Sequence, residues 1–260
     1  MVELILPRAL YAEIIAHARE DAPEEVCGLL AGRGSLATGL VRARNVAPNR
    51  LIDYIVDDQT LLQQFAFEER DTMLMALAPF PYISGAMGRG FQTEFNFVFL
   101  PPLEAAEQME FSERVQEGFR LGLKYGIDVF DGAAGVLLRI GEQFAKGSGS
   151  LKLSAFFLHP QVLWRVLRGL IRSRLAGRNY LLPRDLWQLK CLATGGTDVA
   201  IFRKQIEEYW GRSAIEGYAC TEGGVIAAQL WNYKGLTFFP DCNFLEFIPE
   251  EDAIRSRADP

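Results

Sequence analysis

The sequence predicts an α/β fold, and three observations support this prediction. Short apolar runs of strand length alternate along the chain with stretches whose apolar residues recur every three to four positions. Two of the predicted strands lead into glycine-rich turns, at Gly195-Gly196 and at Gly223-Gly224, where the missing Cβ atoms let a ligand approach the backbone. Hydrophobic residues make up 49% of the 260 residues, which is enough to fill a core in each of two units.

The charge and the cysteine pattern exclude several classes of protein. A formal net charge of −6 and an isoelectric point near 5.2 argue against non-specific binding to nucleic acid, whose phosphates need a cationic surface. The N-terminus lacks a basic start followed by a long apolar run, and no later stretch reaches the length of a membrane span without a charge or a proline. The four cysteines lack Cys-x-x-Cys spacing, so we expect reduced, buried thiols. These features predict a cytoplasmic protein with no nucleic-acid partner and no membrane span.

The first 71 residues are predicted to form a small α/β unit. An apolar stripe at helical spacing covers residues 7–20, and the runs 26–32 and 40–46 read as paired strands across a glycine-rich turn. A short strand over residues 52–56 and a helix over residues 59–69 complete this unit.

This opening unit contains His17, the run from Pro23 to Gly32, Asn45 and the stretch that begins at Tyr54. In these features it resembles the front half of a metal-dependent isopeptidase domain of the JAB or MPN type. The resemblance implies that Glu25, just ahead of the Cys-Gly pair, matches the general base that activates a zinc-bound water. The plainer alternative is a solvated glutamate at the entrance of a strand.

The zinc of that family needs a His-x-His pair and a downstream aspartate. This chain has only two histidines, His17 and His159, and they are far apart in the sequence. We therefore expect no zinc site. We expect His159 to be a satisfied loop histidine, with a substrate contact as the alternative.

The pattern changes between residues 71 and 78, where a charged run gives way to the apolar run 73–77. We place a domain boundary here, between a unit of residues 1–71 and a second unit of residues 76–254. The stretch from Ser84 to Gly90 has the glycine content of a phosphate loop. It lacks the lysine that such loops carry after their last glycine, so an ordinary glycine-rich turn is expected.

The first part of the second unit is predicted from periodicity. Residues 104–125 read as one long amphipathic helix, and residues 136–141 read equally well as a strand or as a buried helix segment. Residues 146–150 form a surface loop. The arginine-rich stretch 162–178 predicts an amphipathic helix with its apolar face on the core, and an anionic membrane surface is the alternative location for that face.

The last part of the chain centres on a strand-helix-strand unit. An apolar strand over residues 189–193, a helix over 199–211 and a short strand over 214–218 place both polar turns at one edge of a sheet. Open α/β sheets bind ligands at such an edge. A mostly buried strand over residues 243–249 and a charged tail over 250–260 follow.

Several motifs lie in this region. They are Leu182-Pro183-Arg184-Asp185-Leu186-Trp187, Gly195-Gly196-Thr197-Asp198, Glu207-Glu208-Tyr209-Trp210-Gly211, the Tyr-x-x-Thr-Glu turn that starts at Tyr218, and the run from Phe239 to Pro249. These motifs are similar to those of the auxin-responsive promoter family of acyl acid amido synthetases, a family of adenylate-forming enzymes, in its prokaryotic branch. The similarity spans residues 79–251, which match only an interior part of such an enzyme.

The resemblance implies part of the N-terminal domain of an adenylate-forming enzyme, with a mixed sheet flanked by helices. It implies ATP and Mg²⁺ as cofactors and a carboxylic acid as substrate, which would be joined to the α-phosphate of ATP. It places Gly195 and Gly196 along the adenine, with Tyr218 stacked on that base.

The same resemblance assigns the catalytic residues. It implies that Thr221 hydrogen-bonds the α-phosphate, that Glu222 holds the magnesium ion, and that Asp241 lies near the ribose.

The phosphate loop of that family lies upstream of the matched region, and its mobile C-terminal domain lies downstream. We therefore expect an incomplete ATP-dependent carboxylate ligase that binds nucleotide weakly. The alternatives are an inactive isopeptidase-like scaffold that binds a protein partner through its N-terminal unit, and a fragment or fusion with no function of its own.

Overall fold

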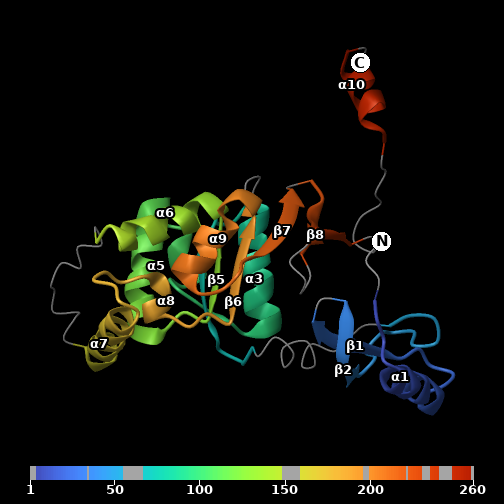
Figure 1. The fold of residues 1–260 in the computed structure, drawn as a ribbon. Coiled ribbons are helices and arrows are strands. Elements are labelled where there is room, and N and C mark those ends of the chain that lie inside the picture. Colours follow the sequence, from blue (N-terminus) through green and yellow to red (C-terminus); the bar gives the residue numbers. More distant parts are fainter. Residues whose placement is uncertain are drawn as a thin grey trace.

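The computed structural model describes residues 4–33, 35–54, 67–147, 159–195, 199–220, 222–229, 235–239 and 248–258. Its strands form two sheets, one with two strands and one with seven (Figure 1). The fold is α/β, as the sequence predicts. Among the described helices, none is both long and apolar enough to cross a membrane.

The N-terminal part contains one helix and the two-stranded sheet. Helix α1 (Arg8–Glu20) precedes β1 (Cys27–Arg33) and β2 (Leu36–Ala43), which pair antiparallel, with Cys27 opposite Ala43. The helix and both strands were expected, although β2 begins and ends a few residues earlier than predicted.

The strand predicted over residues 52–56 is wrong for the residues that the structure describes, because residues 51–54 form a turn and irregular chain. The side-chain amide of Asn45 donates to the carbonyl oxygens of Glu25 and Asp53, at 2.7 and 2.9 Å. These bonds hold residue 53 beside the entrance of β1. Of the helix predicted over residues 59–69, residues 67–69 are not helical and the rest lies outside the described residues.

The large sheet is mixed. Its strands are β3 (Thr72–Ala76), β4 (Val98–Phe99), β5 (Val129–Gly132), β6 (Cys191–Gly195), β7 (Ile215–Cys220), β8 (Gly224–Ala228) and β9 (Thr237–Phe238). They lie in the order β4-β3-β5-β6-β7-β8-β9. The first five are parallel, and β8 and β9 are antiparallel to their neighbours. The apolar run 73–77, where a domain boundary was expected, thus lies in an inner strand.

Eight described helices belong to this part of the chain, and those that pack on the sheet cover both of its faces (Figure 1). They are α3 (Ile83–Phe95), α4 (Leu103–Ala106), α5 (Phe111–Tyr125), α6 (Ala134–Ala145), α7 (Pro160–Leu175), α8 (Pro183–Leu186), α9 (Val199–Trp210) and α10 (Glu250–Ala258). Figure 1 shows α5, α6 and α9 on one side of the sheet and α3 on the other. Two cores result, one on each face.

The main core lies under α5, α6 and α9. The ring of Phe130 on β5 is fully buried and stacks on Trp210 of α9, with 4.7 Å between ring centroids. Phe119 of α5 lies between Phe130 and Trp187, and the indole of Trp187 donates to the carbonyl of Gly122 at 2.9 Å. These aromatic contacts join β5 to α5, α9 and the end of α8.

One expectation for the helices is wrong. The stretch 104–125 is two helices, because the extended backbone at Glu110 interrupts the pattern. The guanidinium of Arg114 in α5 then donates back to the carbonyls of Leu77 and Ala106. The ambiguous run 136–141 is part of helix α6, and most of the charged tail is helix α10.

The glycine-rich turn expected from Ser84 to Gly90 is also wrong, because these residues lie within α3. The glycines serve close packing. A Cβ on Gly85 would lie 2.6 Å from the Cα of Phe80, and one on Gly88 would lie 2.9 Å from the Cε of Met75. Glycine lowers helix propensity by about 1 kcal/mol, but the backbone contact requires it here.

Helix α7 forms as expected, but its predicted orientation is wrong. Val162 is buried and Val166 packs against the main core, whereas most of the other large apolar side chains of α7 are exposed. Of the loop expected over residues 146–150, residues 146–147 form a turn, and the rest lies outside the described residues. The strand predicted over 243–249 lies almost entirely outside them too.

Candidate functional site

The strand-helix-strand unit forms as the sequence predicts. Strands β6 and β7 are parallel neighbours joined by α9, with Ala193 opposite Ile215 and Gly195 opposite Gly217. Both strands extend two residues further than predicted, to Gly195 and Cys220. Because parallel strands end at the same edge, the residues that follow them meet there.

Gly195 and Tyr218 lie together at this edge. Gly195 pairs with Gly217, the residue directly before Tyr218, so two neighbouring positions carry no side chain. The side chain of Tyr218 is 51% exposed. The arrangement leaves open backbone beside an accessible aromatic ring, which suits a planar ligand.

Glu222 lies in the turn between β7 and β8, and its side chain is exposed. The turn is closed by Gly224, whose φ of +68° favours glycine, and the amide of Gly223 donates to Cys220 Sγ at 3.2 Å. The structure therefore places a carboxylate directly beyond the carboxyl end of β7. The other predicted site residues, Gly196, Thr221 and Asp241, lie outside the described residues.

A polar network joins the start of β7 to the end of β8, at the end of this hairpin opposite the turn. The carboxylate of Glu216 on β7 accepts from Arg203 of α9 at 3.3 Å and from the side-chain amide of Gln229 at 2.9 Å. Gln229 also bonds Glu216 through its backbone amide and its side-chain oxygen. These contacts tie α9, β7 and the end of β8 together. Arg203 and Gln229 each lie 13 positions from Glu216 in the sequence, and no sequence motif indicated these contacts.

Thr194 is the strand residue directly before Gly195. Its side chain is 3% exposed, and within the described part of the chain its hydroxyl has no hydrogen-bond partner. A buried hydroxyl without a partner is unfavourable by about 1–3 kcal/mol.

A separate apolar cavity of about 300 Å³ lies between the sheet and α3. Met73, Phe91, Phe95, Phe97, Asp131 and Cys191 are among the residues that line it. Burial raises the pKa of Asp131 to about 6. Burial, followed by the charge of Asp131, raises the pKa of Cys191 to about 11, so this thiol is protonated and unreactive at neutral pH. Sequence reasoning did not identify either residue as part of a cavity.

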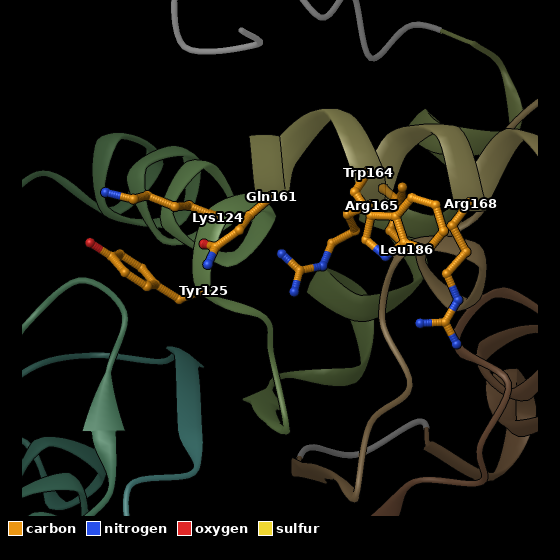
Figure 2. A pocket seen from close by; sticks show the side chains of 7 residues that line it. All are labelled: Lys124, Tyr125, Gln161, Trp164, Arg165, Arg168 and Leu186. Atoms are coloured by element: carbon orange, nitrogen blue, oxygen red, sulfur yellow. The ribbon is translucent and has the colours of Figure 1, made fainter. Parts of the chain in front are cut away.

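A second cavity, of about 310 Å³, is cationic (Figure 2). Lys124, Arg165 and Arg168 line it together with Tyr125, Gln161 and Trp164. Figure 2 shows Arg165, Arg168 and Trp164 projecting from the same helix, α7.

The structure also describes the two histidines, which were considered as zinc ligands. His17 is buried in α1, with Nε2 3.5 Å from Asp21, and His159 caps α7 by accepting from the amide of Gln161. His159 is thus a satisfied histidine, as expected. Among the described residues, no three histidine, cysteine, aspartate or glutamate side chains gather closely enough to hold a metal ion.

No protein-family model matches the sequence, and no curated protein matches it. Several solved structures resemble the chain, among them the following three. Apo MatB from Rhodopseudomonas palustris is 11% identical with a TM-score of 0.37, and the match covers 67% of this chain and 26% of MatB. A malonyl-CoA ligase, in a ternary product complex with methylmalonyl-CoA and AMP, is 17% identical with a TM-score of 0.35, covering 65% of this chain and 28% of that one.

The third structure is a 2-hydroxyisobutyryl-CoA ligase in an open conformation, in complex with 2-HIB-AMP and CoA. It is 14% identical with a TM-score of 0.40, and the match covers 92% of this chain and 48% of the ligase. The chain therefore spans between about a quarter and about half of the length of the structures it resembles.

Proposed function

We propose that residues 79–251 are part of an adenylate-forming domain, related to ATP-dependent acyl acid amido synthetases or acyl-CoA ligases. In this proposal the edge formed by β6 and β7 binds an adenine nucleotide. The observation that carries the proposal is the pairing of Gly195 with Gly217 beside the exposed ring of Tyr218. Open backbone next to an aromatic face suits a flat, apolar base, and carboxyl ends of parallel strands are where α/β sheets bind such ligands.

The phosphate end of the nucleotide belongs beyond β7. Glu222 is exposed in the turn that follows this strand, and Mg²⁺ is commonly held by one or two carboxylates together with the phosphates of a substrate. The network of Glu216, Arg203 and Gln229 restrains the strands on both sides of that turn. In the proposal Thr221 bonds the α-phosphate, Gly196 extends the adenine platform and Asp241 contacts the ribose.

The β- and γ-phosphates have fewer contacts. The glycine-rich stretch from Ser84 to Gly90 lies inside α3 and does not form a loop, and the described residues offer no other glycine-rich phosphate loop. Charge-stabilising contacts of that kind contribute roughly 3–4 kcal/mol each. We therefore expect the 260-residue polypeptide to bind AMP or ATP weakly. We expect no carboxylate-dependent pyrophosphate exchange from this polypeptide.

Titration calorimetry with AMP and ATP, with and without Mg²⁺, tests the site. Tyr218→Ala should weaken the binding of both nucleotides roughly tenfold, since stacking of a base on an aromatic ring contributes about 1–3 kcal/mol to the binding free energy. Glu222→Ala should weaken binding only when Mg²⁺ is present. The matched controls are Tyr11→Ala, an equally exposed tyrosine on α1, and Glu207→Ala, an exposed glutamate on α9, and both should bind like the unmodified protein.

Two results would contradict the proposal. Nucleotide binding that is indifferent to both Tyr218→Ala and Glu222→Ala would exclude this site. Robust pyrophosphate exchange with any carboxylic acid would instead show that the 260 residues complete the reaction.

A further inference from the structure

Helix α7 carries its large apolar side chains on the side that faces away from the protein. Six of them have exposed fractions between 45% and 84%, namely Leu163, Trp164, Leu167, Leu170, Ile171 and Leu175. At 100° per residue these six positions fall on one side of the helix, which we call the outer face of α7. A soluble helix normally buries such a face, so this one is available for contact with another apolar phase.

The orientation of α7 is set by its opposite side, where the residues are small. Val162, Gly169 and Ser173 are buried there. A Cβ on Gly169 would lie 2.8 Å from the Cδ2 of Leu186, and the hydroxyl of Ser173 donates to the carbonyl of Tyr180 at 2.5 Å. Rotating the helix to bury its outer face would break these contacts, so the exposed apolar surface is a stable feature of the fold.

The charges of α7 are all of one sign. Its 16 residues include four arginines and no acidic residue, in a chain whose net charge is −6. Arg165 donates to the carbonyls of Gly122 and Leu123, and Arg168 donates to the side-chain oxygen of Gln188 at 3.3 Å. These acceptors are neutral. The carboxylate that acts on Arg165, Asp128, offsets only part of the positive charge of α7.

Two carboxylates of the described residues, Asp128 and Asp185, also bond groups outside α7. Asp128 accepts from the amide and the hydroxyl of Thr72, and Asp185 is paired with Arg178. Arg165 and Arg168, together with Lys124, line the cavity of about 310 Å³ beside α7. Figure 2 is a close view of this cavity. This cavity has the charge and the size to receive an anionic group such as a phosphate.

We propose that α7 lies in the interfacial region of a membrane that contains anionic lipids, with its outer face against the acyl chains. A lipid phosphate then occupies the cavity lined by Lys124, Arg165 and Arg168. Arginines beside an exposed Trp-Leu-Ile face are typical of helices that lie flat in such an interface. A second copy of the chain fits less well, because joining two outer faces would bring like-charged arginines together with no acidic partner on either helix.

Vesicle flotation of the 260-residue protein tests this proposal. The protein should float with vesicles of phosphatidylcholine and phosphatidylglycerol, but not with vesicles of phosphatidylcholine alone, and high salt should weaken the binding. Arg168→Gln should weaken it about fivefold, because one arginine near an anionic surface contributes about 1 kcal/mol. Leu167→Glu should abolish it, whereas Ile201→Glu on α9, which changes a similarly exposed apolar residue, should leave it unchanged.

Fluorescence of Trp164 gives a readout that does not depend on flotation. Its emission should shift to the blue when anionic vesicles are added, and the shift should be missing in Trp164→Phe. Three results would overturn the proposal. One is equal binding to neutral and anionic vesicles, and another is vesicle binding that survives Leu167→Glu. The third is a dimer in solution that Leu167→Glu dissociates, which would assign the outer face to a second copy of the chain.

Discussion

Arg178 and Asp185 form a bidentate ion pair, in which both terminal guanidinium nitrogens donate to the two carboxylate oxygens at 2.8 Å. The two side chains are 13% and 5% exposed. Asp185 also accepts from the backbone amide of Leu182 at 2.8 Å. The pair joins the loop after α7 to α8, so the Leu182 to Trp187 motif has a structural role in addition to its family resemblance.

Removal of this carboxylate should be strongly destabilising. Asp185→Ala removes the ion-pair partner of the largely buried Arg178, and we expect the free energy of unfolding to fall by about 3–5 kcal/mol. Urea unfolding followed by circular dichroism measures the change. The control is Glu117→Ala, whose partner Arg120 is about half exposed, and it should change stability by no more than about 1 kcal/mol. A loss below that value for Asp185→Ala would contradict the expectation.

Two glycines of α6 should respond in opposite ways to the same substitution. A Cβ on Gly141 would lie 2.7 Å from the Cβ of Tyr209 on α9, whereas a Cβ on Gly135 would meet nothing within 4 Å. Gly141→Ala should therefore destabilise the protein by roughly 1–3 kcal/mol through overpacking. Gly135→Ala should stabilise it by up to about 1 kcal/mol, because alanine is the better helix former. Thermal unfolding of both variants measures these changes. Equal effects of the two substitutions would contradict the close packing of α6 on α9 at Gly141.

The elements predicted correctly are those with a complete local pattern. The apolar spacing between Val199 and Trp210 predicted α9, and both ends of this helix lie within one residue of the predicted range 199–211. The start of β6 was placed two residues early, because Leu189 is buried without belonging to a strand. The adjacency of Gly195 and Tyr218 followed from strand-helix-strand topology, which local patterns are sufficient to indicate.

The features that were missed depend on contacts between distant residues. Gly85 and Gly88 predicted a turn, but they allow α3 to approach the loop at Phe80 and the side chain of Met75. Gly169 decides which side of α7 faces the core, and no helical pattern reveals that Leu186 lies opposite it. The bonds among Arg203, Glu216 and Gln229 also form only after β7 and β8 have paired. These parts of the fold and of the site can be predicted only when the tertiary contacts are known.

The predicted division into residues 1–71 and 76–254 stays a prediction. Because β3 spans residues 72–76 and belongs to the large sheet, we expect the boundary to fall ahead of this strand, and a truncation tests it. Strands β1 and β2 form a sheet of their own, whereas Phe67 packs on Phe97 with 5.5 Å between ring centroids, and Asp71 pairs with Lys190. A polypeptide of residues 67–258 should therefore unfold cooperatively. A polypeptide that begins at residue 77 lacks the inner strand β3 and should not. Loss of cooperative unfolding in the longer polypeptide would contradict the boundary.

Asp131 lies in the apolar cavity under α3 with an exposed fraction of 8%. Burial raises its pKa from 3.8 to about 6, despite a hydrogen bond from the backbone of Gly132 that acts in the opposite direction. The folded protein therefore holds this proton more tightly than the unfolded chain does. Between about pH 4 and pH 6 the folded state binds more protons, so this group lowers stability as the pH rises, and its full unfavourable effect is present above pH 6.

Asp131→Asn should remove this effect, because the amide is neutral at every pH. We expect the variant to exceed the unmodified protein in unfolding free energy by up to about 3 kcal/mol at pH 8, the equivalent of a shift from 3.8 to about 6. The difference should shrink as the pH falls below about 6 and become small near pH 4, where Asp131 is protonated in the folded protein and about half protonated in the unfolded chain. Urea unfolding at these three pH values measures it, with Asp252→Asn on the exposed helix α10 as the control. A variant that is less stable than the unmodified protein at pH 8 would show that the Asp131 carboxylate has a favourable partner in the folded state.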